Sequence, residues 1–269
     1  MPNLLNKVAV VTGAGSGIGR ALAVQLRNEG CALALSDMNE VGLAQTLAEL
    51  PAGSAHVSTH TVDVSDRDAV YAHAEEVRQA HGTAHLIINN AGVGHADLVS
   101  HLEYADLEWV MNINFWGVVY GTKAFLPMMM AQNEGHVVNI SSIFGIVGVP
   151  SQAAYCSSKF AVRGFTESLR QELEGTGVKV SSVHPGGVRT NIIKNARFRR
   201  APDGDESEPD LEKYDQMFRL SASEAARTIV DGIKRQRARI LVGRDAWLLD
   251  RVQRAMPTRY TSLIRRFLS

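Results

Sequence analysis

The sequence predicts an α/β fold: a doubly wound parallel sheet with helices on both faces, formed by a single domain that spans residues 1–269. Short, uninterrupted apolar runs alternate with helical patterns, as expected for parallel strands covered on both faces. The chain has 269 residues, of which 45% are hydrophobic, so it can form one large core. Right-handed crossovers between successive strands then give the doubly wound topology.

Four strands and three helices are predicted in the first third of the chain. Each strand is an aliphatic or β-branched run that stops at a polar residue or glycine, and Gly30 and Gly82 follow two of the helices as stop signals. The predicted strands are Val8–Val11, Ala32–Leu35, His56–Val62 and Leu86–Ile88, and the predicted helices are Ile18–Asn28, Val41–Leu50 and Asp66–His81.

The rest of the chain continues the same alternation. A long helix is expected over Asp106–Met130 with Pro127 near its end, and a second over Tyr155–Leu173. A third, over Ser223–Arg237, takes Ser221 or Ser223 as its cap. The remaining predicted strands are Val137–Ile140, Val178–Val183 and Ile240–Val242.

Polar residues, glycine and proline gather at the carboxyl ends of these strands. Gly13, Asp37, Asp63, Asn90, Ser142 and Pro185 all follow a predicted strand directly or closely. Ligands of doubly wound sheets bind at this edge, near the point where the strand order reverses. The sequence therefore predicts a ligand site at the carboxyl edge of the sheet.

Composition excludes several classes of protein. Lys and Arg total 28, as do Asp and Glu, so no overall charge attracts nucleic acid. Cys31 and Cys156 are too few for a disulfide framework and match no metal-ligand spacing. The polar start, Met1–Lys7, and the absence of an apolar run of about 18 residues predict neither a secretory signal nor a membrane span, and hence a cytoplasmic location.

A glycine-rich turn joins the first strand to the first helix. In Thr12–Gly19 the glycines allow a tight turn and a close approach of the backbone to a pyrophosphate, which the helix N-terminus then favours. The spacing of Gly13, Gly17 and Gly19 differs from the common G-x-G-x-x-G dinucleotide motif. Ser16 and Ile18 belong to the same predicted cofactor-binding turn.

Asp37 ends the second strand, 18 residues beyond Gly19. A carboxylate at that position can accept both hydroxyls of an adenosine ribose, and it would repel a 2′-phosphate. Met38 and Asn39 follow it, so no adjacent basic residue offsets the repulsion. The sequence therefore favours NAD over NADP.

Tyr155 and Lys159 are four residues apart on a predicted helix and share one of its faces. A phenol is a weak base because its pKa is near ~10, and a neighbouring ammonium lowers that pKa. We expect the pair to exchange a proton with an alcohol or a ketone near neutral pH.

Over about Val8–Thr190 the chain resembles the short-chain dehydrogenase/reductase family in its single-domain, Rossmann-type form. The resemblance lies in these motifs, in their order and in their spacing. The resemblance implies that Tyr155 is the acid/base, that Lys159 lowers its pKa and holds the nicotinamide ribose, and that Ser142 stabilises the developing oxyanion. It also implies that Asn114 holds a water linking Lys159 to solvent. Asn112 and Ser141 lack the family spacing. The further cofactor-binding residues implied are Asp63, Val64, Asn90, Ala91, Gly92, Pro185, Gly186, Val188 and Thr190, with Tyr155 and Lys159 also touching the cofactor; no metal is expected.

Two histidines are considered beside this catalytic group. His184 precedes Pro185 at a strand end and is assigned a structural role. His95 follows the Asn-Asn-Ala-Gly element, and both a role in the substrate cleft and a structural role stay open.

Two segments depart from the family pattern. Residues 191–220 are polar and too long for an ordinary connection, and their position favours a substrate lid over a disordered segment. Residues 244–269 form a cationic amphipathic extension. Three interpretations of this extension stay open. It packs on a partner subunit or closes over the cleft; it lies on an anionic membrane surface; or it is a helix that covers the domain and exposes a basic face to solvent. A homodimer through the two long helices, or a homotetramer, is expected, and the extension puts the tetramer in doubt.

The predicted substrate is a small molecule, a lipophilic secondary alcohol or ketone, because the residues expected to line the cleft are apolar: Val93, Ile143, Phe144, Val147 and Val149. The predicted function is hydride transfer between that substrate and a nicotinamide cofactor. The alternatives are an NADPH-dependent 3-oxoacyl thioester reductase and, from a different class, a catalytically silent nicotinamide-sensing regulator.

Overall fold

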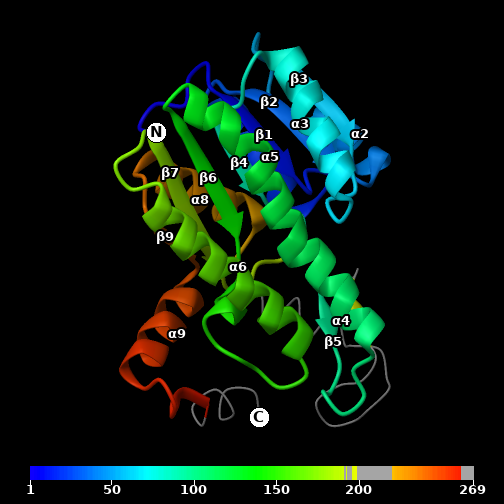
Figure 1. Cartoon of the computed structure of the whole chain (residues 1–269), viewed down its shortest axis with the longest axis vertical. Coiled ribbons are helices and arrows are strands. Elements are labelled where there is room, and N and C mark those ends of the chain that lie inside the picture. The colour runs from blue at the N-terminus through cyan, green and yellow to red at the C-terminus, as the bar shows by residue number, and fades with distance from the viewer. Residues whose placement is uncertain (191, 193–195, 199–219, 262–269) are drawn as a thin grey trace.

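A seven-stranded parallel sheet forms the centre of the computed structural model, which describes residues 1–190, 192, 196–198 and 220–261 (Figure 1). Its strand order is β3-β2-β1-β4-β6-β7-β9, and every pairing is parallel. The strands are β1 (Val8–Thr12), β2 (Ala32–Asp37), β3 (Val57–Thr61), β4 (Leu86–Asn89), β6 (Gly135–Ile140), β7 (Val178–Pro185) and β9 (Arg239–Val242). The predicted doubly wound fold is confirmed.

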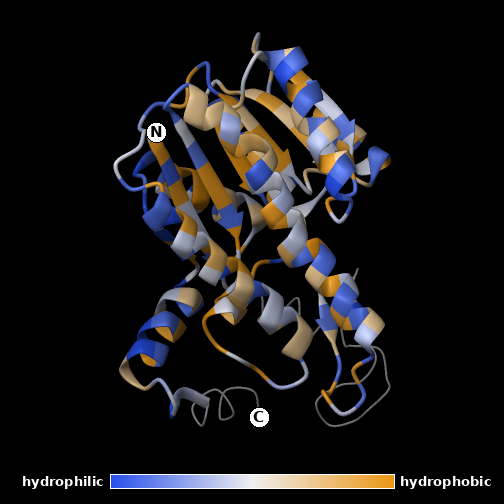
Figure 2. Cartoon of the chain, viewed as in Figure 1, coloured by the Kyte–Doolittle hydropathy of each residue, from blue (hydrophilic) through white to orange (hydrophobic). Residues whose placement is uncertain are grey.

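Helices cover both faces of this sheet. The helices are α1 (Gly17–Asn28), α2 (Glu40–Glu49), α3 (Arg67–His81), α4 (Tyr104–Met111), α5 (Gly117–Ala131), α6 (Ala153–Glu172), α8 (Ala222–Lys234) and α9 (Arg244–Ala255). Ala9 and Val11 of β1 belong to a core shared with α1 and α8, whereas Val10 belongs to a core shared with α3, α5 and α6. Successive residues of one strand thus serve opposite faces, as the pleat requires. Figure 2 shows the resulting hydrophobic band along the strands.

The strand order reverses between β1 and β4. The chain builds outward from β1 to β2 and β3, and then resumes on the other side with β4, β6, β7 and β9. Loops that leave β1 and β4 therefore diverge at their carboxyl ends and leave a crevice there, which is where ligands of such sheets bind.

The helix predicted over Asp106–Met130 is interrupted. A π-helical turn, η1 (Asn112–Trp116), separates α4 from α5, so the continuous α-helix was a wrong prediction. A π-turn admits one extra residue per turn and often lies at a functional site. Here Gly117 packs directly on Val64, where a Cβ would come within 2.9 Å of Val64 Cγ2, and the widened turn contains Asn114.

Two short elements were not predicted. Strands β5 (His95–Ala96) and β8 (Arg197–Phe198) pair in parallel, and their length of two residues leaves no periodic pattern in the sequence. Arg197 lies 3.9 Å from the centre of the Trp109 ring and pairs with the buried Asp106 at 2.8 Å. Most of the predicted lid, 191–220, lies outside the described residues.

The C-terminal extension begins with α9, which packs on the segment that follows β6. That segment starts with the 3₁₀ turn η2 (Ile143–Gly145), and Ile143, Val147 and Ala246 form a third small core. The Tyr260 hydroxyl accepts a hydrogen bond from the Gly148 N–H at 3.2 Å. Within the described residues, no helix is both long and apolar enough to cross a bilayer. Residues 262–269 of the predicted extension are outside the described part of the chain.

Candidate active site

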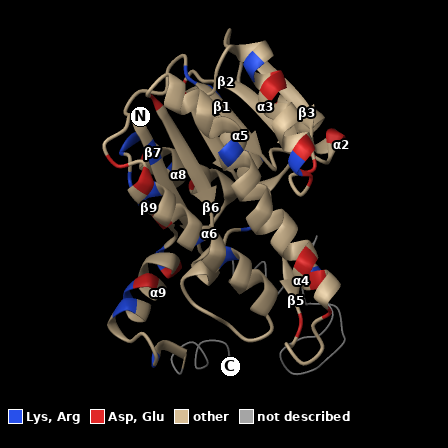
Figure 3. Ribbon diagram, in the orientation of Figure 1, with Lys and Arg blue, Asp and Glu red and all other residues tan. Residues whose placement is uncertain are grey.

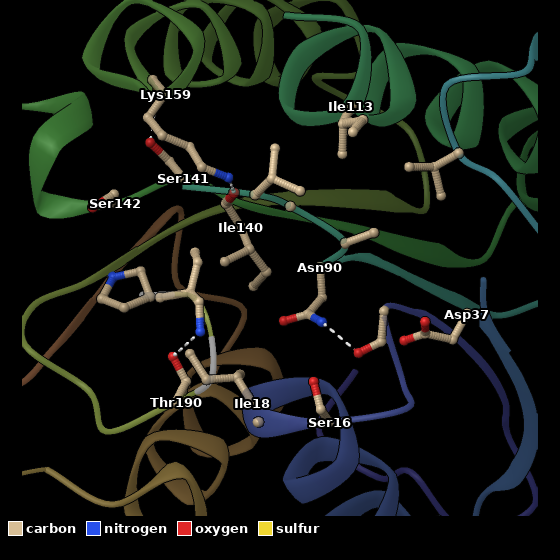
Figure 4. Close-up of a pocket in the computed structure, with 18 of the residues that line it drawn as sticks. Ser16, Ile18, Asp37, Asn90, Ile113, Ile140, Ser141, Ser142, Lys159 and Thr190 are labelled. Carbon is tan, nitrogen blue, oxygen red and sulfur yellow. Dashed lines mark hydrogen bonds between the residues drawn. The ribbon is translucent and has the colours of Figure 1, made fainter. Parts of the chain in front are cut away.

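A pocket opens at the carboxyl edge of the sheet, between the loops after β1, β4, β6 and β7 (Figure 4). It is lined by Gly13, Ser16, Gly17, Ile18, Asp37, Met38, Val62, Asp63, Val64, Asn90, Ala91, Gly92, Val93, Ile113, Ile140, Ser141, Ser142, Tyr155, Lys159, Pro185, Gly186, Val188, Thr190 and Ile192. Every predicted cofactor-binding residue is in this set except Gly19. Residues 177 positions apart in the sequence are thus brought to one edge of the sheet.

The glycine turn requires glycine for backbone reasons. Gly13 has φ +65° and Gly17 has φ +52°, both in the left-handed region that side chains disfavour. A Cβ on Gly13 would come within 2.8 Å of the Ala91 Cα, and a Cβ on Gly19 would overlap the Gly13 carbonyl. Gly19 therefore packs beneath the turn and supports it, while Gly13 and Gly17 present bare backbone to the pocket.

Asn90 joins the glycine turn to the end of β4. Its backbone N–H donates to Thr12 Oγ1 at 3.0 Å, and its side-chain amide donates to the carbonyls of Thr12 and Gly13 at 2.9 and 3.2 Å. The Ala91 N–H also donates to Thr12 Oγ1, at 3.1 Å. These bonds fix two of the pocket's loops relative to each other.

Asp37 lies at the far end of the pocket, at the end of β2. Its carboxylate accepts hydrogen bonds from the Gly15 N–H at 2.8 Å and from the Asn39 N–H at 2.9 Å. Met38 lies beside it, and Lys159 is the one lysine or arginine among the described residues that line the pocket. Lys159 comes from α6 and lies at the opposite end of the pocket from Asp37 (Figure 4). The Asp37 end therefore has no basic side chain among the described lining residues and presents an acidic and apolar surface.

Ser142, Tyr155 and Lys159 meet at the opposite end. The Lys159 ammonium donates to the Ile140 carbonyl at 3.0 Å and lies 5.7 Å from the centre of the Tyr155 ring. Ser141, the residue without the family spacing, donates its hydroxyl to the Lys159 carbonyl at 2.8 Å. Ser142 instead accepts a hydrogen bond from the Phe144 N–H at 3.1 Å and interacts with Tyr155.

The pKa of Tyr155 differs from the sequence-based expectation in its direction. Burial raises the pKa of Tyr155 to about 12, and a hydrogen bond with Ser142 opposes this only in part. Burial also lowers the pKa of Lys159 to about 8. The net direction for the ligand-free protein is therefore the opposite of the predicted lowering of the Tyr155 pKa, and loss of solvation is its largest cause. The Lys159 ammonium is 5.7 Å from the ring centre.

Asn114 lies behind the pocket and does not line it. Its side-chain oxygen accepts from the Val93 N–H at 2.8 Å, and its amide nitrogen donates to the Val93 carbonyl at 3.0 Å and to Ser158 Oγ at 3.1 Å. A Cβ on Gly92 would be 3.0 Å from Asn114 Oδ1 and 3.4 Å from Lys159 Nζ. Both polar groups therefore lie against Gly92, and a side chain at this position would crowd Asn114.

The two histidines considered from the sequence, His95 and His184, are both buried. His184 is buried, and its Nδ1 bonds the Ser142 carbonyl at 3.0 Å while its Nε2 bonds Ser182 Oγ at 2.8 Å. A carbonyl only accepts, so Nδ1 carries the proton, and burial lowers the pKa of His184 to about 4. His95 is buried in β5, 3.6 Å from Asp106, and is not among the described residues that line the pocket.

Only some of the apolar residues predicted to line the substrate cleft lie near the pocket. Val93 lines the pocket. Ile143 and Val147 do not, because they are buried in the small core under α9, and Phe144 and Val149 pack against that core. The Phe144 ring still approaches the Tyr155 ring edge-on, with centres 6.3 Å apart.

Comparison of the sequence and the fold with known proteins identifies the family of this chain. The family model for short chain dehydrogenases matches residues 7–201. The chain belongs to the short-chain dehydrogenase family. It is therefore an NAD(P)-dependent oxidoreductase that acts on CH–OH groups, which confirms the predicted family and enzyme class.

Three relatives cover nearly the whole of this short-chain dehydrogenase. The Mycobacterium tuberculosis protein SadH is 46% identical over 267 residues, which cover 98% of this chain and 96% of that protein. Human estradiol 17-beta-dehydrogenase 11 is 32% identical over 270 residues, covering 99% of this chain and 85% of that protein. The solved structure of a Burkholderia phymatum short chain dehydrogenase/reductase in complex with NAD is 35% identical, with a TM-score of 0.84 and 95% of each chain covered.

The residues of this short-chain dehydrogenase fit a dinucleotide. The glycine turn exposes backbone at the N-terminus of α1, where N–H groups and the helix dipole favour a pyrophosphate. Asp37 at one end can accept ribose hydroxyls, and Lys159 at the other can donate to them. The bare backbone at Gly13 and Gly17 is the shape that a ligand approaching the main chain needs.

Some pocket residues of this short-chain dehydrogenase were missed. Met38, Val62, Ile113, Ile140 and Ile192 line the pocket and were not predicted to do so, and the same holds for Ser141, which adjoins Ser142. The first four adjoin predicted site residues or end a predicted strand, so proximity in sequence could have found them. The roles of Ser158 and Thr12 depend on hydrogen bonds between distant segments, which no local pattern reveals.

Proposed function

We propose that this short-chain dehydrogenase transfers hydride between NAD and a lipophilic secondary alcohol or ketone. The observation that carries the proposal is the convergence of Ser142, Tyr155 and Lys159 at one end of a pocket whose other end is closed by Asp37. A proton donor pair and a ribose-binding carboxylate at opposite ends of one pocket match the two ends of a nicotinamide dinucleotide.

In the direction of ketone reduction, Tyr155 donates a proton to the substrate oxygen. Its raised pKa keeps the phenol protonated near neutral pH, as a donor requires. The Ser142 hydroxyl donates a hydrogen bond to the same oxygen and stabilises the charge that develops on it. Bound nicotinamide supplies or accepts the hydride, and its oxidised ring brings a positive charge to this end of the pocket.

Lys159 returns the proton to Tyr155. Because its pKa is about 8, the ammonium can both lose and regain a proton near neutral pH. Asn114 Oδ1 and Lys159 Nζ both lie beside Gly92, and each can bond a water molecule. We propose that a water there completes the path from Lys159 to solvent, in keeping with the role predicted for Asn114.

Asp37 supports NAD as the preferred cofactor. Its carboxylate is already held by two backbone N–H groups, Gly15 and Asn39, so it cannot swing aside freely to admit a 2′-phosphate. Arg20, the basic residue after the glycine turn, donates to the Gly15 carbonyl at 2.7 Å and pairs with Glu49 at 2.7 Å. It is therefore committed beneath the turn rather than available to a phosphate.

A lipophilic substrate is supported by Val93 and Ile192, which are apolar residues of the pocket lining, and by Phe144, whose ring meets that of Tyr155 edge-on. A relative named for estradiol, which is a lipophilic secondary alcohol, points to the same class. The test is a screen of alkyl and aryl ketones, sugars and 3-oxoacyl thioesters with NADH and with NADPH, followed at 340 nm. Turnover of ketones with NADH is expected. Preference for a thioester with NADPH would favour the reductase alternative, and binding of cofactor without any turnover would favour the regulator.

We propose a homodimer built on the outer faces of α5 and α6. Phe160 of α6 is 41% exposed, and Trp116, the last residue of η1, is 43% exposed and stacks on Tyr120 of α5 with ring centres 5.8 Å apart. Exposed aromatic side chains on one face are typical of an interface. Light scattering should give twice the chain mass, and Trp116→Glu should give the monomer; a wild-type monomer would contradict the proposal.

The outward face of α9 supports contact with an anionic membrane surface. Trp247 and Leu248 are about half exposed, and Arg251 stacks on Trp247. Arg244 lies three residues before Trp247 and so shares this face of the helix. Figure 3 shows basic and acidic residues along α9. Vesicles containing phosphatidylglycerol should sediment the protein and vesicles of phosphatidylcholine should not. Double replacement of Trp247 and Arg251 by Ala should abolish sedimentation, and unchanged sedimentation of that variant would refute the contact.

A further inference from the structure

The loop after β7 is bound to the first turn of the C-terminal helix. The Gly187 N–H donates to the Asp245 carboxylate at 2.6 Å, and the Gly186 N–H donates to the Val242 carbonyl at 2.9 Å. The Gly186 Cα lies so close to that carboxylate that a Cβ there would overlap it. A side chain 58 residues beyond Gly187 in the sequence thus contacts two consecutive residues of the loop.

This loop forms one wall of the pocket. Pro185, Gly186, Val188 and Thr190 all line it. The preceding residue, His184, bonds the Ser142 carbonyl at 3.0 Å, so the loop begins beside the catalytic group. Thr190 also faces the glycine turn, since a Cβ on Gly17 would be 3.3 Å from Thr190 Cβ. The conformation of residues 185–190 therefore determines the shape of the pocket beside the catalytic group.

The loop needs an external anchor. Gly186 and Gly187 have no side chains to pack, and two consecutive glycines lose more backbone entropy on ordering than other residues do. A hydrogen bond from a backbone N–H to a carboxylate is stronger than one between neutral groups. Asp245 lies in the first turn of α9, where the helix dipole also favours a negative charge.

We propose that Asp245 is a positioning residue that holds the Pro185–Gly187 loop in the shape that binds the nicotinamide half of the cofactor. It does not touch the reacting atoms, and it acts through Gly187. The inference rests on the proposed function, because it takes this end of the pocket to be the nicotinamide end. It gives α9, an addition to the common form of the family, a role in cofactor binding within its own subunit.

The test separates the two halves of the cofactor. Binding of NADH and of ADP-ribose, which lacks the nicotinamide, is measured by calorimetry for wild type, Asp245→Ala and Asp245→Asn. Asp245→Ala is expected to weaken NADH binding tenfold or more and to leave ADP-ribose binding within twofold. Asp245→Asn keeps an acceptor oxygen, so it is expected to recover most of the lost affinity.

A second acidic residue of α9 provides the matched control. Asp250 pairs with Arg239 of β9 at 2.8 Å, which anchors the helix to the sheet, and with Arg254 of its own helix at 2.9 Å. None of its ion pairs among the described residues involves the loop. Asp250→Asn is expected to leave the ratio of NADH to ADP-ribose affinity unchanged. Equal weakening of both ligands by Asp245→Ala, or the same change in ratio in both α9 variants, would overturn the inference. Wild-type protein that binds neither ligand would instead refute the proposed function itself.

Discussion

Replacing Lys159 by Met should stabilise the ligand-free protein while abolishing its activity. Lys159 is 3% exposed and forms no ion pair among the described residues, and its ammonium donates to the Ile140 carbonyl. Burial of an unpaired ammonium is unfavourable, which is why its pKa falls from 10.5 to about 8. A methionine fills a similar volume without that charge.

The magnitude follows from the pKa change. Each pKa unit corresponds to about 1.4 kcal/mol, so the fall from 10.5 to about 8 makes charged Lys159 unfavourable by ~3 kcal/mol in the folded state. Loss of a donor to the Ile140 carbonyl offsets ~1 to 2 kcal/mol of the gain. The free energy of unfolding should therefore rise by about 1 to 2 kcal/mol near pH 7.

The pH dependence gives a sharper test. Below the folded pKa of about 8 the side chain is charged in both states, so wild type bears the full penalty. Between that value and 10.5 the folded state loses its proton first, and wild type gains stability relative to Lys159→Met. Urea unfolding of both proteins at about pH 7 and about pH 9.5, at one protein concentration, should show the advantage of the variant shrinking. An advantage that is absent at pH 7, or that grows with pH, would refute the reasoning.

Three further substitutions test other parts of the site. Asp37→Ala should remove the repulsion of a 2′-phosphate and reduce the preference for NADH over NADPH at least tenfold in kcat/KM; an unchanged ratio would show that Asp37 does not select the cofactor. Gly13→Ala should lower the melting temperature and weaken NADH binding, because φ +65° and the nearby Ala91 backbone leave no room for a methyl; near-wild-type binding would contradict the packing described. Gly92→Ala fills the space proposed for water, so kcat should fall while NADH affinity stays within about threefold, and an unchanged kcat would remove that water from the path.

The sheet and most of the pocket were predictable because their signals are local. Strands such as Val8–Thr12 are largely apolar runs, and a glycine or a polar residue follows them directly, as Gly13 does here. The carboxyl ends of parallel strands meet at one edge, so residues that follow different strands, such as Asp37 and Ser142, could be assigned to one site before their positions were known.

The features that could not be predicted depend on packing between distant segments. The π-turn at Asn112–Trp116 has the same apolar spacing as an α-helix, so its sequence does not reveal it. Ile143 and Val147 were assigned to the cleft because they follow Ser142, but α9 offers them a core instead. The amphipathic pattern of 244–269 predicted a helix without indicating which surface it would contact.

The direction of the Tyr155 pKa was wrong for a related reason. Helical spacing correctly put Lys159 near Tyr155, and the pattern alone suggested that the cation would dominate. Burial depends on the whole fold, and it raises the pKa of the phenol more than its polar neighbours lower it. The same burial lowers the pKa of Lys159, so the pair is suited to pass a proton rather than to hold a fixed phenolate.

The most direct test of the central claim compares wild type with Tyr155→Phe, which removes the phenolic oxygen and keeps the ring. NADH oxidation is followed at 340 nm with the best ketone from the screen, and NADH binding is measured separately on the same preparations. The proposed proton route predicts a loss of about 10²- to 10⁴-fold in kcat with NADH affinity within about threefold of wild type. A variant that retains wild-type kcat would contradict it.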